Sequence, residues 1–161
     1  MKTLKDLITE FEGDELKPYI CPAGFNSIGR GYNFDANPLP EDIKAYLDAH
    51  GEITQEMSDR LLKISSKKAE MDLDAALAVP IIFNGEKAYR MPPGSIFPNR
   101  YIALTSVMFN VGPAGFRKFK KMIKAVQDGD WSKAADELLN SKRTKQVGER
   151  AEIEARMLRE G

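Results

Sequence analysis

The sequence predicts a mostly helical α+β protein with a small β-hairpin near its N-terminus, a long helix after it and several further helices. Three observations lead to this prediction. A short amphipathic stretch is followed by a segment punctuated by proline and glycine, which is typical of a helix and then a hairpin. A long helical pattern covers residues 54–78. Apolar residues at helical spacing resume at residue 99 and continue towards the C-terminal end.

The length of 161 residues and the hydrophobic content of 42% suit a single compact domain with a proper core.

Charge, cysteine content and hydropathy exclude several classes of protein. A formal net charge of +0 argues against a nucleic-acid binder. Cys21 is the single cysteine and His50 the single histidine, so we expect no internal disulfide, no metal and no cofactor. The polar N-terminus does not have the pattern of a signal peptide, and no apolar stretch reaches membrane-spanning length. We therefore expect synthesis in the cytoplasm without stable membrane association.

The first helix is predicted to carry a carboxyl group at its C-terminal end. Thr3 and Asp6 form a capping box ahead of apolar residues at helical spacing, namely Leu4, Leu7, Ile8 and Phe11. Gly13 ends the helix, which places Glu12 in its last turn beside the apolar face. The negative end of the helix dipole and partial burial both favour the protonated carboxyl, as a general acid requires.

The next segment predicts a β-hairpin. Its first strand covers Leu16–Cys21, Pro22-Ala23-Gly24 forms the turn, and Phe25–Tyr32 returns. One face of the returning strand carries Phe25, Ser27, Gly29 and Gly31. Two glycines beside a hydroxyl predict a bare strip on which a flat ligand could lie close to the backbone. Taken singly, these residues would also fit an ordinary capped helix and hairpin with a surface glutamate.

Glu12, Cys21 and Ser27 follow one another with eight and then five residues between them. This spacing resembles the phage-type lysozymes (endolysins, glycoside hydrolase family 24), whose pattern is Glu, eight residues, Asp or Cys, five residues, Thr. The positions in register are Glu12-Gly13, Leu16, Tyr19, Gly24, Ile28-Gly29 and Gly31. The departures are Cys21 in place of the commoner Asp, Ser27 in place of Thr, and Tyr32 in place of the usual His.

Two helices are predicted after the hairpin. A short one covers residues 41–47 and is broken by Gly51. Thr54 caps a long one that extends to about Ala78. The lysozyme resemblance implies that this helix, at about residues 54–78, joins a small β-lobe at about 13–53 to a larger helical lobe at about 79–161. In that arrangement the N-terminal helix belongs to the helical lobe, and the long helix forms one wall of the cleft between the lobes.

Residues 81–98 look like an insertion relative to shorter members of the family. Asn84-Gly85 predicts a hairpin turn within it, and Pro92-Pro93-Gly94 excludes a helix. Both a loop on the rim of the cleft and a passive surface excursion fit the composition.

The helical lobe contains a second stretch in register with the family. A helix beginning near Asn99 is apolar nearly all round and ends at Phe109-Asn110-Val111-Gly112. Asn110 is either a helix C-cap or an amide that faces the sugar cleft. A further match, DGDWSKAADELL, has Asp130 as the helix cap and Trp131 as a core residue.

The last predicted helix, Glu149–Arg159, carries Arg150, which matches a family arginine near the cleft. The resemblance implies that Arg150 orients the catalytic carboxylate or binds a substrate carboxylate. Without the motif, it would be an ordinary surface arginine.

The resemblance implies a lysozyme-like fold and a muramidase that cleaves the β-1,4 bond between N-acetylmuramic acid and N-acetylglucosamine in peptidoglycan. Glu12 would protonate the leaving oxygen, while Cys21 and Ser27 would position the attacking water. The implied substrate-binding residues are Gly29, Gly31, Tyr32, Asn110 and Arg150. The protein would be a monomer whose partner is peptidoglycan, made in the host cytoplasm and acting on the wall in the periplasm to lyse the cell.

Two other functions stay open at this stage. A lytic transglycosylase needs one acid/base group, and the missing Asp is compatible with it. A non-catalytic wall-binding or phage structural protein could keep the fold, although an intact Glu12 argues against this. The basic runs at residues 117–124 and 141–145 fit either solvated helix faces or attraction to an anionic polymer such as cell wall.

Overall fold

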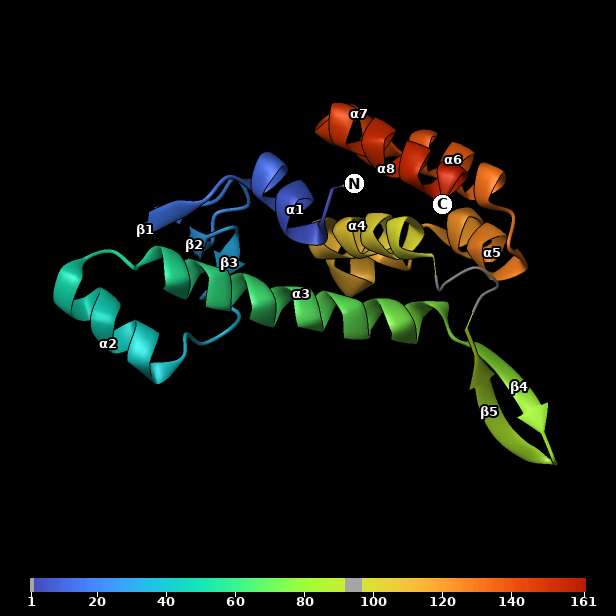
Figure 1. Ribbon diagram of the computed structural model, residues 1–161, viewed down its shortest axis with the longest axis horizontal. Helices are drawn as coiled ribbons and strands as arrows, with labels where there is room; N and C mark the ends of the chain where they lie inside the picture. The colour runs from blue at the N-terminus through green and yellow to red at the C-terminus, as the bar shows by residue number, and fades with distance from the viewer. Residues whose placement is uncertain (1, 92–96) are drawn as a thin grey trace. The chain divides into compact units, whose positions relative to one another are not determined.

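The computed structural model describes residues 2–91 and 97–161 and divides into two compact units, Met1–Lys67 and Lys68–Gly161 (Figure 1). The division falls within the long helix α3, Gln55–Leu77. A small antiparallel sheet in the first unit and several helices in the second confirm the predicted mostly helical α+β class. The predicted turn at Pro92-Pro93-Gly94 lies outside the described residues.

The first unit holds the predicted hairpin lobe. In chain order its elements are α1 (Leu4–Glu12), β1 (Glu15–Ile20), β2 (Asn26–Gly29), β3 (Tyr32–Asn33), α2 (Glu41–His50) and the first part of α3. The three strands form one antiparallel sheet in the order β1-β2-β3.

Side-chain caps set the helix starts as predicted. Thr3 Oγ1 accepts the Asp6 N–H at 3.1 Å while the Asp6 carboxylate accepts the Thr3 N–H at 2.9 Å, which completes the capping box of α1. Thr54 Oγ1 accepts the Met57 N–H at 3.2 Å at the start of α3. Gly51, in the left-handed conformation, ends α2 beyond the predicted range of 41–47.

The returning strand of the hairpin is shorter than predicted. β2 ends at Gly29, and the chain turns through Gly29, Arg30 and Gly31 before β3 begins at Tyr32. Gly29 has φ +62° and Gly31 has φ +74°, a region that side-chain-bearing residues rarely adopt. Along a continuous strand, every second side chain lies on the same face. This turn interrupts that alternation, so Gly29 and Gly31 do not form the predicted bare strip on one face of the strand.

Arg30, at the centre of this turn, is buried and ties the sheet to α3. Its guanidinium group contacts Asp14 at 2.9 Å and Asp59 at 2.8 Å. The Ser58 hydroxyl of α3 donates to the Asp14 carboxylate at 2.5 Å. The same carboxylate thus binds both Arg30 and α3. A buried arginine with two carboxylate partners fixes the position of the Gly29–Gly31 turn.

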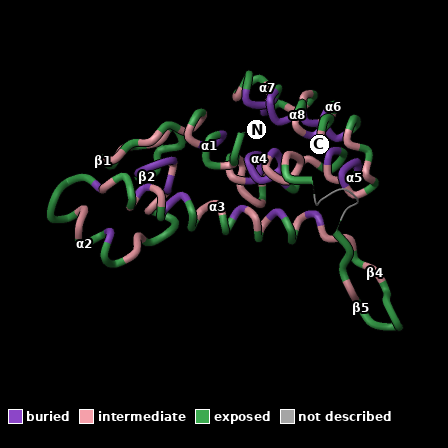
Figure 2. Tube along the Cα trace, viewed as in Figure 1, coloured by how far each residue is buried: buried purple, intermediate pink, exposed green. Residues whose placement is uncertain are grey.

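The core of the first unit lies between the sheet, α2 and the start of α3, as the buried segments in Figure 2 show. It consists of Ile28, Tyr32, Ile43, Ile53 and Leu61. Tyr32 also donates its phenolic hydrogen to the Pro38 carbonyl at 3.0 Å.

The second unit begins with the end of α3 and contains a two-stranded sheet and the remaining helices. These elements are β4 (Val79–Phe83), β5 (Glu86–Arg90), α4 (Pro98–Phe116), α5 (Lys120–Asp128), α6 (Trp131–Leu139), α7 (Lys142–Val147) and α8 (Glu149–Glu160). The short helix α7 begins in the basic run at residues 141–145, for which the sequence predicted no separate helix.

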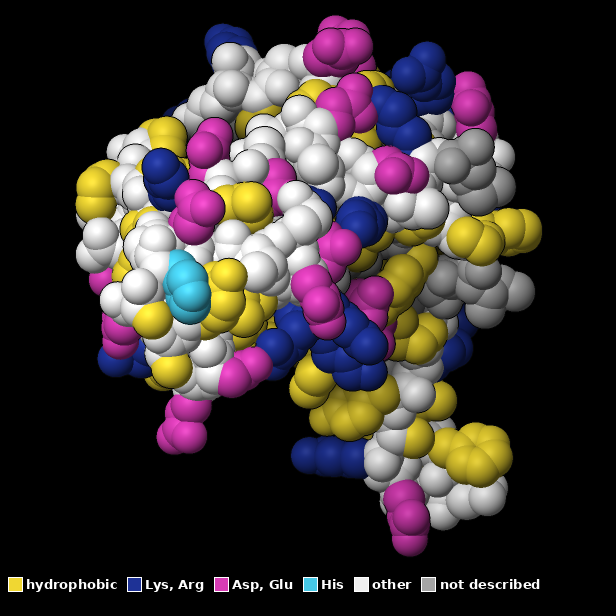
Figure 3. Space-filling model, turned by 60° about the vertical axis from the view of Figure 1, so that its left-hand side comes forward, with side chains coloured by type: hydrophobic (Ala, Val, Ile, Leu, Met, Phe, Trp, Pro, Cys, Tyr) yellow, Lys and Arg dark blue, Asp and Glu magenta, His cyan; other side chains and the backbone are white. Residues whose placement is uncertain are grey.

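The inserted hairpin has the predicted turn. Asn84 and Gly85 both have positive φ, +49° and +80°, and they connect the paired strands β4 and β5. Large apolar side chains are exposed on this hairpin, and Figure 3 shows hydrophobic side chains along it. They are Ile82, Phe83 and Tyr89.

Helices α4, α5, α6 and α8 enclose the core of the second unit. Helix α4 is buried in its central part, from Ala103 to Met108, and kinks at Gly112, where φ is +69° and Pro113 begins the next turn. Asp130 caps α6 by accepting the Lys133 N–H at 3.0 Å. Trp131 packs against the core, as predicted, with the Arg100 guanidinium group over its ring at 4.6 Å.

Candidate active site

Glu12 is the last residue of α1, and Gly13 caps the helix directly after it. The side chain is half-buried. A methyl group added at Gly31 would lie 3.7 Å from the Glu12 Oε2 atom. A side chain at residue 31 would therefore contact the Glu12 carboxyl.

The register of β1 and β2 brings the other candidate residues to the same face. Tyr19 and Ser27 are direct cross-strand partners in the antiparallel pair. Cys21 follows Tyr19 by two residues and so lies on the same side of the chain. The predicted grouping of Cys21 with Ser27 is thus present, and Tyr19 joins it.

Cys21 lies at the start of a tight turn that surrounds its sulfur with hydrogen-bond donors. Its own N–H donates to the Phe25 carbonyl at 2.9 Å, and the Gly24 N–H donates to the Cys21 carbonyl at 2.8 Å. The backbone N–H of Phe25, together with those of Ala23 and Gly24 and the Ser27 hydroxyl, lowers the pKa of the Cys21 thiol below its ordinary value. Donors directed at a sulfur stabilise the thiolate.

Ser27 is almost fully buried beneath this turn, with 1% of its surface exposed. Its hydroxyl lies 3.3 Å from the Phe25 carbonyl oxygen and within hydrogen-bonding reach of the Cys21 sulfur. Because a hydroxyl has one hydrogen to donate, Ser27 can give it to the carbonyl or to the thiolate. The position of Ser27 is suited to orienting the Cys21 side chain.

Tyr19 is a candidate site residue that the sequence analysis placed in the motif without a role. Burial, and then the negative charge of Glu12, raise the pKa of the Tyr19 phenol, and Cys21 contributes in the same direction. Tyr19 is thus electrostatically coupled to both predicted catalytic groups. Its phenol remains protonated and can donate a hydrogen bond at neutral pH.

Two predicted substrate-binding residues are placed differently from the expectation. Gly29 is buried, and a Cβ there would lie 2.9 Å from Ser58 Oγ, so the residue faces α3. Tyr32 is 6% exposed and belongs to the core of the first unit. Both residues lie inside the first unit. Neither presents the open surface that sugar binding was expected to use.

Asn110 and Arg150 lie in the second unit, where a buried charge network holds them. Arg143 donates to Asn110 Oδ1 at 2.8 Å and to Glu154 Oε2 at 2.7 Å. Arg150 donates to Glu154 Oε1 at 3.1 Å, and Ser106 donates to the same oxygen at 2.7 Å. The Asn110 amide oxygen thus binds an arginine of α7, while the residue itself is exposed. Its two expected roles, a helix C-cap and an amide that faces the sugar cleft, both stay predictions.

Arg143 and Glu154 were missed by the sequence analysis. Arg150 and Glu154 are four residues apart on α8, a spacing that predicts an ion pair but not its burial. The side chain of Glu154 is 0% exposed and that of Arg143 is 5% exposed. Arg143 belongs to the basic run at 141–145, for which solvated helix faces and attraction to an anionic polymer were both left open; neither alternative included burial.

Neither a metal site nor a membrane span is found in the described parts of the chain. Within residues 2–91 and 97–161, no three His, Cys, Asp or Glu side chains are grouped so that they could hold a metal ion. No helix of those residues combines the length and apolarity needed to cross a membrane.

A small antiparallel sheet that gathers a carboxyl group, a phenol and a thiol of lowered pKa, in a mostly helical protein, has the general features of an acid–base glycoside hydrolase. The phage lysozyme family model matches residues 9–156. The chain belongs to the phage lysozyme family, and it is accordingly a lysozyme, a hydrolase that acts on peptidoglycan.

Three similar proteins agree with this assignment. Probable T4-type lysozyme 2 of Dictyostelium discoideum is 31% identical over 147 residues, which cover 88% of this chain and 84% of that protein. The endolysin of Acyrthosiphon pisum secondary endosymbiont phage 1 is 26% identical, covering 91% of this chain and 82% of its own. Probable T4-type lysozyme 1 of D. discoideum is 23% identical, with coverage of 88% and 84%.

Proposed function

We propose that this chain hydrolyses the β-1,4 bond between N-acetylmuramic acid and N-acetylglucosamine with Glu12 as general acid and the Cys21 thiolate as the group that activates water. Glu12 would donate its proton to the glycosidic oxygen as the bond to the anomeric carbon breaks. The thiolate would accept a proton from a water molecule that attacks the opposite face of that carbon. This is the division of labour of an inverting glycosidase.

The observation that carries the proposal is the turn around Cys21. A neutral thiol is a poor base, and an Asp is commoner at this position of the family motif. The N–H groups of Phe25, Ala23 and Gly24, with the Ser27 hydroxyl, lower the pKa of the thiol and so increase the fraction of thiolate near neutral pH. The lowered pKa thereby favours a negative charge at the position where the motif otherwise supplies a carboxylate.

Tyr19 supports the same pair of roles. Its protonated phenol lies near the negative charges of Glu12 and Cys21. We infer that Tyr19 donates a hydrogen bond to whichever of the two groups is ionised, or to the attacking water. Gly31, which has no side chain beside the Glu12 carboxyl, leaves room there for the sugar.

The biological setting is part of the proposal. We propose that the protein is a monomer made in the cytoplasm of a phage-infected bacterium, and that it reaches the wall after release to cause lysis. The phage endolysin among its relatives supports this setting.

Three variants of Cys21 test the proposed base. Cys21→Asp should retain or raise hydrolysis of purified peptidoglycan, because Asp is ionised at neutral pH. Cys21→Ala should lose most hydrolysis, and Cys21→Ser should lie between them. A fully active Cys21→Ala enzyme whose products end in anhydro-muramic acid would refute hydrolysis and favour the transglycosylase. Melting temperatures of the three variants serve as the control for folding.

A further inference from the structure

Two segments of the first unit meet at the Glu12 carboxyl, and one arginine joins them. The first segment is the end of α1 with the two residues that follow it, Gly13 and Asp14. The second is the turn between β2 and β3, in which Gly31 approaches the Glu12 carboxyl. Arg30 belongs to this turn, and its guanidinium group contacts the Asp14 carboxylate at 2.9 Å. The ion pair thus links the segment that carries Glu12 to the segment that borders it.

A second contact fixes the same guanidinium group to α3. Arg30 Nη1 donates to Asp59 Oδ1 at 2.8 Å, and Asp59 also accepts a hydrogen bond from Lys5 of α1 at 2.8 Å. The Ser58 hydroxyl donates to Asp14 at 2.5 Å. Helix α3 therefore holds α1, the segment after α1 and the β2–β3 turn through charged and hydroxyl side chains.

Stability alone does not account for the burial of Arg30. Its side chain is 4% exposed, and its buried Nε–H has no hydrogen-bond partner among the residues that the structure describes. The desolvation of that donor is therefore uncompensated. Replacement of a buried ion pair by apolar residues of similar volume is often neutral or stabilising. Apolar side chains do not supply a fixed direction, whereas a guanidinium group between two carboxylates is oriented by its planar set of donors.

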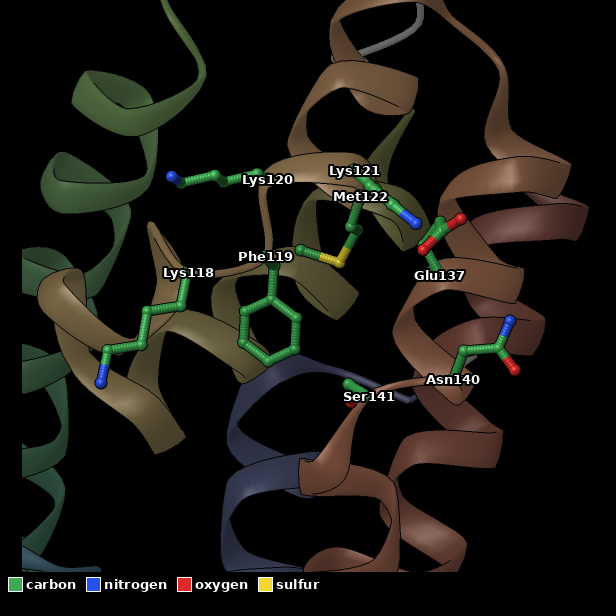
Figure 4. A pocket seen from close by; sticks show the side chains of 8 residues that line it. All are labelled: Lys118, Phe119, Lys120, Lys121, Met122, Glu137, Asn140 and Ser141. Carbon is green, nitrogen blue, oxygen red and sulfur yellow. The ribbon is translucent and has the colours of Figure 1, made fainter.

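The lysines around an open hollow of the second unit offer a contrast. This hollow of ≈ 320 Å³ lies beside α5 and α6, and Figure 4 shows the side chains of Lys118, Lys120 and Lys121 around it. All three lysines are exposed. Water solvates and salt screens such charges, so they do little to fix the backbone that carries them. The burial of Arg30 is what gives its ion pairs a structural consequence.

The turn that Arg30 holds is a neighbour of both Glu12 and Tyr19. The Gly31 backbone is within hydrogen-bonding reach of the Tyr19 phenol, and a Cβ at the same residue would lie 3.7 Å from Glu12 Oε2. A displacement of this turn would therefore move the phenol and change the space beside the carboxyl. Because a misplacement of about 1 Å can lower a catalysed rate about a hundredfold, the position of the turn matters to catalysis.

We propose that Arg30 is a positioning residue for cleavage of the glycan. Its two ion pairs hold the turn at Gly31, and the turn holds Glu12 and Tyr19 in the arrangement that proton transfer to the glycosidic oxygen requires. This inference rests on the proposed function, because it takes Glu12 as the general acid. Arg30 acts through the backbone of the turn, without contact with the sugar. The expected signature is a lower kcat at an unchanged KM, since the alignment lost is that of the transition state.

A paired apolar replacement separates positioning from stability. Asp14→Leu/Arg30→Met removes both charges of the buried contact together, and Asp59, whose side chain is 40% exposed, stays solvated. On soluble glycan strands, with new ends of either kind counted, we expect kcat to fall roughly tenfold to hundredfold and KM to stay within about twofold. The melting temperature should stay within about 4 °C of the parent.

The matched control is Asp42→Leu/Arg60→Met. It removes an arginine–aspartate contact of 2.6 Å between α2 and α3 in the same unit, away from the β2–β3 turn. The control has the same change of side chains and of charge as the test variant. It should keep the kcat and the KM of the parent.

Amide hydrogen exchange tests the geometry without catalysis. The exchange rate of the Gly31 amide, divided by that of the Ile28 amide in the adjoining strand, reports the order of the turn. In Asp14→Leu/Arg30→Met this ratio should rise at least about tenfold, whereas the control pair should leave it unchanged. A general loss of stability accelerates both amides and so does not move the ratio.

Asp59→Asn decides the case if the paired variant does not fold. It withdraws one of the two carboxylates that hold Arg30 from a side chain that is 40% exposed, and it should lower kcat about twofold to fivefold at an unchanged KM. Its control is Lys5→Gln, which breaks the other ion pair of Asp59 and leaves Arg30 in place. Lys5→Gln should keep the kcat of the parent.

Several results would overturn the positioning role. They are an unchanged kcat or exchange ratio in the folded paired variant, an equal fall of kcat in its control, a loss confined to KM, and, where the pair does not fold, an unchanged kcat in Asp59→Asn. The proposed function fails differently. A Glu12→Gln protein that cleaves glycan as fast as the parent refutes the proposed function, whereas an inactive Glu12→Gln protein beside a fully active paired variant refutes only the role of Arg30.

Discussion

Glu154 is the least exposed charged side chain among the described residues of the second unit, and its neutralisation should be severely destabilising. The carboxylate is 0% exposed and receives Arg143 at 2.7 and 3.1 Å, Arg150 at 3.1 Å and Ser106 at 2.7 Å. Glu154→Gln keeps the shape of the side chain but removes the negative charge between two guanidinium groups that are 5% and 3% exposed. Removal of one partner from a buried ion pair costs about 3–5 kcal/mol.

For a chain of this length, about 1 kcal/mol shifts the melting temperature by roughly 2–4 °C, so the expected fall is roughly 6–20 °C. Thermal unfolding followed by circular dichroism measures it. The control is Asp128→Asn, which breaks an i,i+4 pair with Lys124 whose side chains are 70% and 52% exposed. That change should cost at most about 0.5 kcal/mol. A Glu154→Gln protein that melts within about 2 °C of the parent would refute the role assigned to the buried network.

Two further predictions concern the first unit. Alkylation of Cys21, the single cysteine, should reach half of its maximal rate at a lower pH than alkylation of a cysteine peptide, because the folded turn lowers the thiol pKa. Ser27→Ala removes one donor and should move that midpoint back upwards; an unshifted midpoint in the parent protein would contradict the proposed thiolate. Gly29→Val should destabilise the protein by about 2–4 kcal/mol in urea unfolding, because φ is +62° and the new Cβ would lie 2.9 Å from Ser58 Oγ. Gly51→Val, at φ +74° with open space around it, should cost less, and equal losses would show that contact with Ser58 is irrelevant.

The parts of the fold that were predictable are those decided by neighbouring residues. The capping box of Thr3 and Asp6, the cap at Thr54 and the Asn84-Gly85 turn each depend on a few consecutive side chains and on their intrinsic backbone preferences. The assignment of Glu12 to the end of a helix depends on the same kind of local signal, the glycine that follows it.

The turn through Gly29 and Gly31 was not predictable in this way. Glycine is compatible with both an extended strand and a positive φ. Gly29 and Gly31 therefore fit a continuous strand as well as a strand that ends in a turn. The deciding contact is between Arg30 and two carboxylates, Asp14 and Asp59, that lie far from it in sequence. Only the folded unit shows that this arginine is buried.

The burial of charged side chains was the other feature that local sequence patterns did not predict. The burial of Arg143 and Glu154 was not predicted, because charged residues usually lie at the surface. Their burial requires α4, α7 and α8 to meet around one carboxylate, which no sequence window contains. The lowered pKa of Cys21 has the same origin, because it depends on the direction of backbone N–H groups in a folded turn.

Digestion of purified peptidoglycan, with mass spectrometry of the released ends, tests the central claim most directly. The parent protein should release reducing N-acetylmuramic acid ends, because water is the nucleophile. Glu12→Gln should reduce the release by at least about a hundredfold while leaving the melting temperature near that of the parent, since it removes the proton and keeps the shape. Release of ends by Glu12→Gln at a rate comparable with that of the parent would contradict the assignment of Glu12 as the general acid.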